Sequence, residues 1–339
     1  MKPVRVGIIG CGVMGKMHAN CYRALSDMAQ VVGVADVRRE EAAAVAQLTG
    51  ARIYDSAEEL LGDSHIDAVD ICVPTFLHKK YVVQAAQAKK QILCEKPAAL
   101  TMADVHEMVA AARRARVRLM FGMVIRFWPE YQALADIVTE KRFGRLTTLV
   151  CTRLASPPTY GWENWFADPR RSGGAALDLH IHDVDFICWV LGAPRGLTAR
   201  ARRTREGLVH IMAVYDYPGM VVAAEGGWDQ DPAAGFDMGF RATFEDGTTL
   251  EYHSRTGTFK QYHRGAVSDV SVPRYNAHSD VGGNISDLGG YYNEIRYWCT
   301  CLRDSRPCDR VSLESVLRSH EVVFNEIRSA TRAAERGKR

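Results

Sequence analysis

Three glycines near the N-terminus have the spacing of a phosphate-binding loop. They are Gly10, Gly12 and Gly15 of GCGVMG, which lies between the apolar run VRVGII and KMHANCYRAL, a segment with apolar residues at helical intervals. Gly10 can make a tight turn, Gly12 lets the backbone approach a pyrophosphate, and Gly15 lets the helix pack closely on the strand. Val13 and Met14 begin the helix, where the first N–H groups can bind phosphate oxygens. The pattern predicts a dinucleotide site.

A carboxylate stands where such a site would hold the ribose. Asp36 ends the next apolar run, QVVGVAD, 21 residues after Gly15. An acidic residue about 20 positions past the loop hydrogen-bonds the ribose hydroxyls of NAD. Arg38 and Arg39 follow and could pair with a 2′-phosphate, which Asp36 would repel. NAD is therefore the expected cofactor, and NADP stays open.

The first third of the chain alternates between strand-like and helix-like segments. The expected strands are VRVGII, QVVGVAD, ARIY, IDAVDICVP, QILCEKP and RLMFGM, and segments of helical periodicity separate them. Alternating units of this kind form a parallel sheet that is covered by helices on both faces. We therefore expect an α/β protein in which residues 1–124 form a doubly wound, Rossmann-type NAD(P)-binding domain.

Polar residues follow two of these strands. Pro74, Thr75 and His78 come after the fourth strand, and Glu95 and Lys96 come after the fifth. Ligands of open parallel sheets bind at the carboxyl ends of the strands, so we expect these residues to contact the cofactor. An ordinary loop between strand and helix is the alternative for the first group. Lys96 stands where its ammonium could reach a ligand.

Together these segments resemble the Gfo/Idh/MocA oxidoreductases, which act mainly on sugars and cyclic polyols. The similarity rests on GCGVMG, PTFLH, EKP and GGAALDLHIHDVD, in this order between residues 10 and 185. In that family the lysine of EKP is catalytic, and a D-x-x-x-H pair lines the substrate site. The resemblance assigns these roles to Lys96, Asp178 and His182. It also implies two domains and self-association through the open face of a second sheet.

The segment around Asp178 has the periodicity of one helix. Its apolar residues recur at three- and four-residue steps, at Leu177, Ile181, Val184, Ile187, Cys188 and Leu191. Asp178, His182 and Asp185 would then lie together away from the apolar face, with Asp178 and His182 one turn apart. His180 would point the other way, into the core. Because His180 and His182 diverge on a helix, we expect no metal site here.

These residues suggest a hydride-transfer mechanism as a hypothesis. A secondary alcohol would give its hydride to the nicotinamide while Lys96 polarises the oxygen, His182 takes the proton and Asp178 orients His182. Histidine titrates near neutral pH without adjustment, whereas lysine needs desolvation or a nearby positive charge. Which of Lys96 and His182 accepts the proton stays open. Arg126 and Tyr160 are the expected substrate contacts.

The expected activity is the reversible, NAD(P)-dependent oxidation of a secondary hydroxyl to a ketone. The substrate would be a cyclic polyol or a sugar, inositol-like or an amino sugar of a biosynthetic pathway. The alternative is a sugar sensor on the same fold that binds NAD without turnover. A sensor would need the glycines but not Lys96, Asp178 and His182, all of which are present.

Residues 125–339 are expected to form a second, α+β domain for substrate binding and oligomerisation. After RLMFGM the alternation stops, and RLTTLVCTRL, GLVHIMAVYDY, MVVAAEGGW, FRATF and TTLEYH have the pattern of strands. Turns at Pro218-Gly219 and Asp246-Gly247 predict a largely antiparallel, open sheet. Helices close the chain, and the last helix could pack back on the first domain. A homo-oligomer, dimer or tetramer, is expected.

Composition limits the other function classes. The 339 residues carry a formal charge of +3 with no basic stripe, which argues against a nucleic-acid partner. No apolar segment reaches the eighteen residues of a membrane span, and the glycines interrupt the N-terminal apolar run. Nine cysteines without zinc or redox spacing are expected to be structural thiols. We therefore expect a cytoplasmic enzyme without a membrane partner.

Overall fold

The chain forms two compact units, each made of segments that are distant in sequence. The computed structural model describes residues 2–273 and 288–336. Of these, unit 1 comprises residues 2–127, 160–163 and 288–317, and unit 2 comprises residues 128–159, 164–273 and 318–336. The first change of unit thus falls close to the expected boundary at residue 124. Residues 288–317, which we expected in the second domain, cluster with unit 1.

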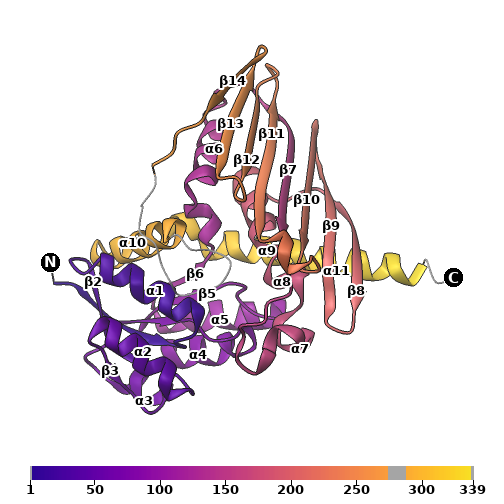
Figure 1. The fold of residues 1–339 in the computed structure, drawn as a ribbon. Coiled ribbons are helices and arrows are strands. Elements are labelled where there is room, and N and C mark those ends of the chain that lie inside the picture. Colours follow the sequence, from indigo (N-terminus) through magenta and orange to yellow (C-terminus); the bar gives the residue numbers. More distant parts are fainter. Residues whose placement is uncertain (1, 274–287, 337–339) are drawn as a thin grey trace. The chain divides into compact units, whose positions relative to one another are not determined.

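Unit 1 contains a parallel sheet of six strands in the order β3-β2-β1-β4-β5-β6 (Figure 1). The strands are β1 (Val4–Ile9), β2 (Ala29–Ala35), β3 (Arg52–Ile53), β4 (Ala68–Ile71), β5 (Gln91–Glu95) and β6 (Leu119–Gly122). Each lies within a run that the sequence predicted, because these runs are short, largely apolar and separated by segments of helical periodicity. The strand order reverses between β1 and β4, which is the point where ligands of doubly wound sheets bind.

Helices connect the strands of this sheet. They are α1 (Val13–Ala24), α2 (Arg39–Thr49), α3 (Ala57–Gly62), α4 (Thr75–Gln87) and α5 (Met102–Ala115), followed by the 3₁₀ turn η1 (Val124–Phe127). Ser56 and Thr101 cap α3 and α5 by accepting the N–H groups of Glu59 and Asp104. Helix α4 begins at Thr75, earlier than its apolar periodicity indicated, so the PTFLH segment is its first turn.

A helix from the far end of the chain completes unit 1. Helix α10 (Gly289–Arg303) packs against α1, and the 3₁₀ turn η4 (Asp309–Val311) leads to α11 (Leu313–Arg336). Tyr291 of α10 brings its ring to 6.0 Å from the ring of His18 in α1. Unit 1 therefore exceeds the expected first domain chiefly by residues 160–163, by α10 and η4, and by the first residues of α11.

Unit 2 contains an open sheet of eight strands in the order β14-β13-β12-β11-β7-β10-β9-β8. The strands are β7 (Leu146–Leu154), β8 (Leu197–Thr204), β9 (Gly207–Tyr217), β10 (Met220–Gly227), β11 (Asp237–Phe244), β12 (Thr249–His253), β13 (Thr258–His263) and β14 (Ala266–Asp269). The pair β7–β10 is parallel and the other neighbours are antiparallel. The predicted turns are confirmed, with Gly219 and Gly247 at positive φ.

Helices cover one face of this sheet. The helices of unit 2 are α6 (Pro129–Thr139), α7 (Pro169–Ser172), α8 (Ala175–Asp178), α9 (Ile181–Leu191) and the end of α11. The 3₁₀ turn η2 (Trp162–Ala167) spans the change of unit at residue 163, and η3 (Pro232–Ala234) lies in unit 2. Helices α8 and α9 contact β7, β9 and β10. The opposite face carries exposed apolar side chains, with Met212, Val214 and Val221 49%, 52% and 61% exposed.

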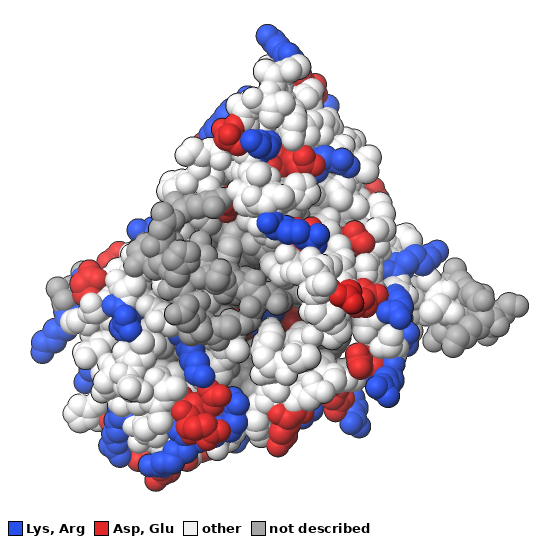
Figure 2. Space-filling model, viewed as in Figure 1, with Lys and Arg blue, Asp and Glu red and all other residues white. Residues whose placement is uncertain are grey.

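Charged side chains of both signs share the visible surface, and the helices are not of the membrane-spanning kind. On the face drawn in Figure 2, Lys and Arg side chains are interspersed with Asp and Glu side chains. Within the described residues, every helix is too short or too polar to serve as a membrane span.

A buried ion pair joins sheet and helix in unit 2. Arg153 points from β7 into the covered face, and its Nε and Nη2 donate to the two carboxylate oxygens of Asp183 in α9 at 2.8 and 3.0 Å. Both side chains are buried, so the two charges depend on each other. The neighbouring Asp183 carboxylate helps to keep the pKa of Arg153 above its usual value despite burial.

Replacing one member of this pair should destabilise the protein. We expect Asp183→Asn to lower the free energy of unfolding by about 3 kcal/mol, because the Arg153 charge stays buried without a carboxylate. The matched control is Glu245→Gln, which breaks the exposed pair of Glu245 with Arg145 at 2.8 Å and should cost less than about 1 kcal/mol. Urea unfolding measures both, and equal losses would contradict the expectation.

Candidate functional site

The glycine loop at the end of β1 needs two of its glycines for its own shape. Gly10 has a φ of +92°, and a Cβ there would lie 2.7 Å from the carbonyl carbon of Cys72. A Cβ on Gly15 would lie 2.1 Å from the carbonyl oxygen of Gly10. Gly12 differs, because its φ is −69° and a Cβ there would meet just Nη2 of Arg38, 3.7 Å away. The open space at Gly12 is what the close approach of a pyrophosphate requires.

The helix that follows offers its N-terminus to this space. Gly12 is the N-cap of α1 and provides no side-chain cap, and Lys16 donates the first helical N–H bond, to the carbonyl oxygen of Gly12 at 3.0 Å. The N–H groups of Val13 and Met14 precede that bond. The partial positive charge at a helix N-terminus favours phosphate there.

Asp36 is fastened to the glycine loop. Its Oδ2 accepts the N–H of Cys11 at 2.6 Å, and its Oδ1 accepts the N–H of Arg38 at 2.8 Å. Nη1 of Arg38 lies 3.1 Å from Oε1 of Glu41, so the guanidinium already has an acidic partner. The carboxylate therefore stands at the end of β2 in a fixed orientation beside the loop.

The ends of β1, β4 and β5 form one connected edge. Gly10 packs closely against Cys72 at the end of β4, because a Cβ added to Gly10 would lie 2.7 Å from the carbonyl carbon of Cys72. His78 of α4 then links the β4 end to the β5 end, since its Nε2 lies 2.9 Å from the carbonyl oxygen of Val73 and its Nδ1 lies 2.9 Å from that of Pro97. Burial lowers the pKa of His78. His78 thus has backbone partners in both loops, and Thr75 beside it is buried behind the N-cap residue Pro74.

The EKP turn extends from this edge. Glu95 and Pro97 are buried, whereas Lys96 between them is partly exposed. Oε2 of Glu95 accepts the N–H of Lys96 at 2.9 Å. The lysine side chain therefore starts from a backbone position that is fixed by its preceding residue.

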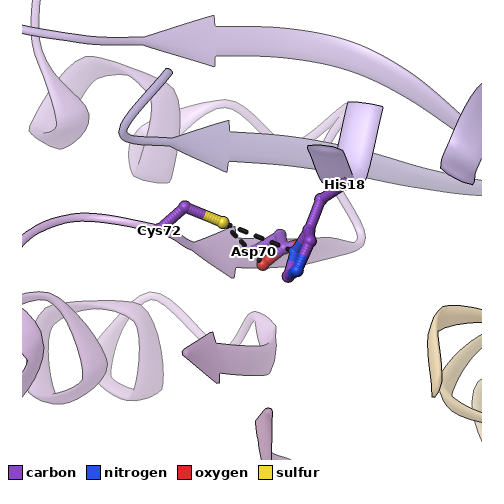
Figure 3. Close-up of side chains that lie close together, drawn as sticks. All are labelled: His18, Asp70 and Cys72. Atoms are coloured by element: carbon purple, nitrogen blue, oxygen red, sulfur yellow. Dashed lines mark hydrogen bonds and ion pairs between the residues drawn. The ribbon is translucent and has the colours of Figure 1, made fainter. Parts of the chain in front are cut away.

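Behind the turn lies a buried cluster of titratable side chains, part of which Figure 3 shows. His18 of α1 places Nδ1 2.9 Å from Oδ2 of Asp70 and Nε2 3.1 Å from Oε1 of Glu95. Tyr22 donates its hydroxyl to the same Asp70 oxygen at 3.0 Å, and the Cys72 thiol donates to Oδ1 at 3.3 Å. Burial opposes a charge on His18, but chiefly Asp70 keeps the pKa of His18 well above its ordinary value.

In unit 2, the predicted helix around Asp178 is wrong as one continuous element. Helix α8 ends at Asp178, and α9 begins at Ile181. The N–H of His180 bonds to the carbonyl oxygen of Ala175, five residues back, so one extra residue is inserted in the turn. The four-residue spacing of Asp178 and His182 therefore does not place them one regular turn apart. Their side chains are 7% and 8% exposed.

The neighbours of this pair have structural partners. His180 is buried as expected, and its Nε2 lies 3.0 Å from Oε2 of Glu326 in α11. Asp185 is also buried and accepts the hydroxyl of Ser319 at 2.7 Å. Helix α11 thus contacts the turn at His180 and the following helix α9 at Asp185.

Sequence comparison with protein families identifies both parts of the chain. Residues 4–123 match an oxidoreductase family with an NAD-binding Rossmann fold, GFO_IDH_MocA, and residues 131–259 match the GFO/IDH/MocA C-terminal domain. The chain belongs to the Gfo/Idh/MocA family. The resemblance carried by GCGVMG, PTFLH, EKP and the Asp178 segment is therefore confirmed.

Relatives of this Gfo/Idh/MocA protein include dehydrogenases of polyols and sugars. A myo-inositol 2-dehydrogenase of Thermotoga maritima is 32% identical over 191 residues, 56% of this chain and 55% of the relative. A D-glucoside 3-dehydrogenase of Escherichia coli is 32% identical over 194 residues, 57% of this chain and 55% of the relative. The chain thus spans about half the length of these curated relatives.

A solved structure has the same fold over nearly the whole chain. The UDP-N-acetylglucosamine 3-dehydrogenase of Acidithiobacillus ferrooxidans superposes with a TM-score of 0.77 at 25% identity, covering 97% of this chain and 98% of that one. The expected fold class, a parallel Rossmann sheet followed by a largely antiparallel open sheet, is confirmed.

The two expected substrate contacts differ in exposure. Arg126 of η1 is fully buried, and its Nη1 donates to the carbonyl oxygen of Arg310 and to the hydroxyl of Ser315, both at 2.8 Å. These bonds give Arg126 a structural role within unit 1. Tyr160 is 46% exposed and can meet a ligand. Substrate binding by either residue stays a prediction.

The buried cluster also has the composition of a metal site. Potential ligand atoms of His18, Asp70 and Cys72, and of His18, Glu95 and Glu294, lie within 4.8 Å of one another. Nδ1 of His18, however, is hydrogen-bonded to Asp70, and Nε2 lies 3.1 Å from Oε1 of Glu95 in an ion-pair contact without hydrogen-bond geometry. A ring that carries protons on both nitrogens has no lone pair for a metal ion. We therefore interpret the cluster as a network of ion pairs.

Sequence reasoning missed His18 and Asp70. A signal was present, because Asp70 is a charged residue inside the otherwise apolar strand IDAVDICVP, and a buried carboxylate requires partners. The identity of those partners was not readable, since His18 lies 52 positions away in the chain.

The glycine loop gives a test of cofactor binding that separates shape from function. We expect Gly12→Ala to keep its stability within about 1 kcal/mol, because its φ and its surroundings accept a Cβ. The same variant should bind NAD at least about tenfold more weakly, since the methyl group occupies the pyrophosphate approach. Gly15→Ala, with its backbone clash, should instead lose stability. Calorimetric titration and thermal unfolding measure these effects, and unchanged NAD affinity in Gly12→Ala would refute the assignment.

Proposed function

We propose that this protein is an NAD-dependent dehydrogenase that oxidises a secondary hydroxyl of a cyclic polyol or sugar to a ketone. The observation that carries the proposal is the connected edge of unit 1. There the glycine loop touches the β4 end, His78 links the β4 and β5 ends, and Lys96 projects from the fixed EKP turn. A cationic side chain is thus held beside a dinucleotide site. The relatives, dehydrogenases of inositol and of glucosides, support the substrate class.

The proposal assigns distinct roles to three residues. Lys96 hydrogen-bonds the reacting oxygen and polarises it, His182 accepts the hydroxyl proton, and Asp178 orients His182. NAD, when bound, supplies the acceptor for the hydride. The low exposure of Asp178 and His182 supports these roles, because a proton acceptor in a nearly dry setting keeps a defined hydrogen-bond partner. The reverse reaction uses the same groups, with the proton returned to the alkoxide.

NAD rather than NADP is the proposed cofactor. Asp36 is held by two backbone N–H groups at the end of β2, where it can accept the ribose hydroxyls. A 2′-phosphate would meet that carboxylate, and Arg38 is already paired with Glu41. The charge at this position therefore favours the unphosphorylated ribose.

We also propose that the protein is a cytoplasmic homo-oligomer. The open face of the unit 2 sheet exposes Met212, Val214 and Val221 on adjacent strands, which suits burial against a second copy. All nine cysteines are free thiols, which suits a reducing compartment.

Turnover by the purified protein tests the proposed reaction. We expect reduction of NAD with an inositol, a hexose, an amino sugar or one of their glycosides. On that substrate, Lys96→Met and His182→Ala should each lower kcat by about 100-fold or more, because the first removes the group that polarises the reacting oxygen and the second removes the proton acceptor. Lys80→Met and His253→Ala are matched controls at exposed positions. They should retain normal rates.

Two outcomes would contradict the proposal in different ways. Near-normal turnover in both Lys96→Met and His182→Ala would refute the residue assignment. Tight NAD binding without turnover of any substrate class would favour the sugar sensor, which needs the glycine loop but not the three residues.

Cofactor choice can be tested at one position. The wild-type protein should have a higher kcat/KM for NAD than for NADP, and Asp36→Ser should raise the NADP-to-NAD ratio at least about tenfold, because it removes a negative charge beside the 2′ position. Initial rates with both cofactors measure the ratio. A wild-type preference for NADP would overturn the assignment to Asp36.

A further inference from the structure

A chain of polar contacts runs from the interior of β4 to the backbone of Lys96. It passes from Asp70 to Nδ1 of His18 at 2.9 Å, from Nε2 of His18 to Oε1 of Glu95 at 3.1 Å, and from Oε2 of Glu95 to the N–H of Lys96 at 2.9 Å. The side chains of Asp70, His18 and Glu95 are buried. All four residues belong to unit 1.

The protonation of His18 follows from its neighbours. A neutral imidazole has one N–H and one lone pair, and a lone pair facing a carboxylate oxygen at about 3 Å is repulsive. Nδ1 of His18 is hydrogen-bonded to such an oxygen and Nε2 lies 3.1 Å from another, so the arrangement favours a ring that carries both protons. The cation thus lies between the carboxylates of Asp70 and Glu95, with that of Glu294 within 4.8 Å of His18 and Glu95, and these groups are costly to bury unpaired.

Glu95 connects His18 to the backbone of Lys96. Its two carboxylate oxygens face two different donors, His18 on one side and the Lys96 backbone on the other. Oε2 is held by a hydrogen bond, whereas Oε1 lies 3.1 Å from Nε2 of His18 in an ion-pair contact without hydrogen-bond geometry. The acceptor for the Lys96 N–H is therefore fixed as long as His18 holds the other oxygen.

We propose that His18 is a positioning residue for Lys96, acting through the Glu95 carboxylate to fix the backbone of the EKP turn. The inference rests on the proposed function in so far as Lys96 takes part in the reaction. The imidazole is buried and does not meet the substrate, so its effect on turnover is indirect. A displacement of about 1 Å in a group that contacts the reacting oxygen can cost about 100-fold in rate.

Two substitutions of His18 test its two ring nitrogens separately. Glutamine can place its amide nitrogen near the Nε2 position and keep a donor toward Glu95. Asparagine, which is shorter, can place its amide nitrogen near the Nδ1 position and keep a donor toward Asp70 alone. Tyr22→Phe is the matched control, because it removes a hydroxyl bonded to Asp70 but leaves the chain to Lys96 intact.

Amide hydrogen exchange of Lys96 in the ¹⁵N-labelled protein tests the positioning without any substrate. We expect slow exchange in wild type, Tyr22→Phe and His18→Gln, and exchange at least about tenfold faster in His18→Asn, since Glu95 is then held by the Lys96 N–H alone. Equal protection in His18→Asn and His18→Gln would overturn the proposal.

A double-mutant cycle on the active enzyme tests the link to catalysis. His18→Asn should lower kcat by about 100-fold with KM changed less than about threefold, while His18→Gln restores most of the rate. In the Lys96→Met background, His18→Asn should have little further effect, because both changes act through one group. Multiplicative losses would show a general structural role and refute the proposal.

The wild-type protein provides a measurement that does not depend on variant folding. The ¹⁵N resonances of the His18 ring should report two protonated nitrogens at pH 7. A neutral ring at that pH would overturn the bridging geometry. If the wild type turns over no substrate, the proposed function fails, whereas the exchange and ring measurements still decide whether His18 positions Lys96.

Discussion

A carboxylate buried within a β-strand sets a requirement that much of unit 1 satisfies. Asp70 lies in β4, where every residue is buried. An unpaired charge in that setting would cost several kcal/mol, so the strand can pair in the sheet only if groups from other elements meet Asp70. His18 and Tyr22 of α1 and the thiol of Cys72 do so. The contact fixes α1, and with it the glycine loop, against the centre of the sheet.

The pairing of His18 also extends to the EKP turn. Asp70 occupies only one of the two ring nitrogens of His18, so the other nitrogen needs a second partner. Nε2 of His18 lies 3.1 Å from Oε1 of Glu95 at the end of β5. Oε2 of Glu95 accepts the N–H of Lys96. On the other side of the turn, His78 bonds the carbonyl oxygen of Pro97. The loop that carries the proposed catalytic lysine is therefore held at the residues before and after it, and Lys96 alone is left partly exposed.

The sequence predicted what local patterns determine. All six strands of unit 1 and the hairpins at Pro218-Gly219 and Asp246-Gly247 follow from hydrophobic runs and turn residues. Strands β8, β13 and β14 were missed, because LTARARRT, TFKQYH and AVSD lack a continuous apolar face. The inserted residue before α9 was missed because the apolar spacing continues across it. Contacts of His18 depend on residues more than 50 positions away and follow from no local pattern.

The two imidazoles beside the EKP turn also differ in how they respond to pH. Burial lowers the pKa of His78, while for His18 burial is opposed by Asp70 and Cys72, which together raise the pKa of His18. A raised pKa contributes stability that is present at low pH and is lost as pH rises through the folded-state value, so His18 favours the fold until pH reaches its raised folded-state pKa. A lowered histidine pKa has the opposite effect, so His78 disfavours the fold once pH falls below its unfolded value, about 6.5. The turn is thus most stable between these limits.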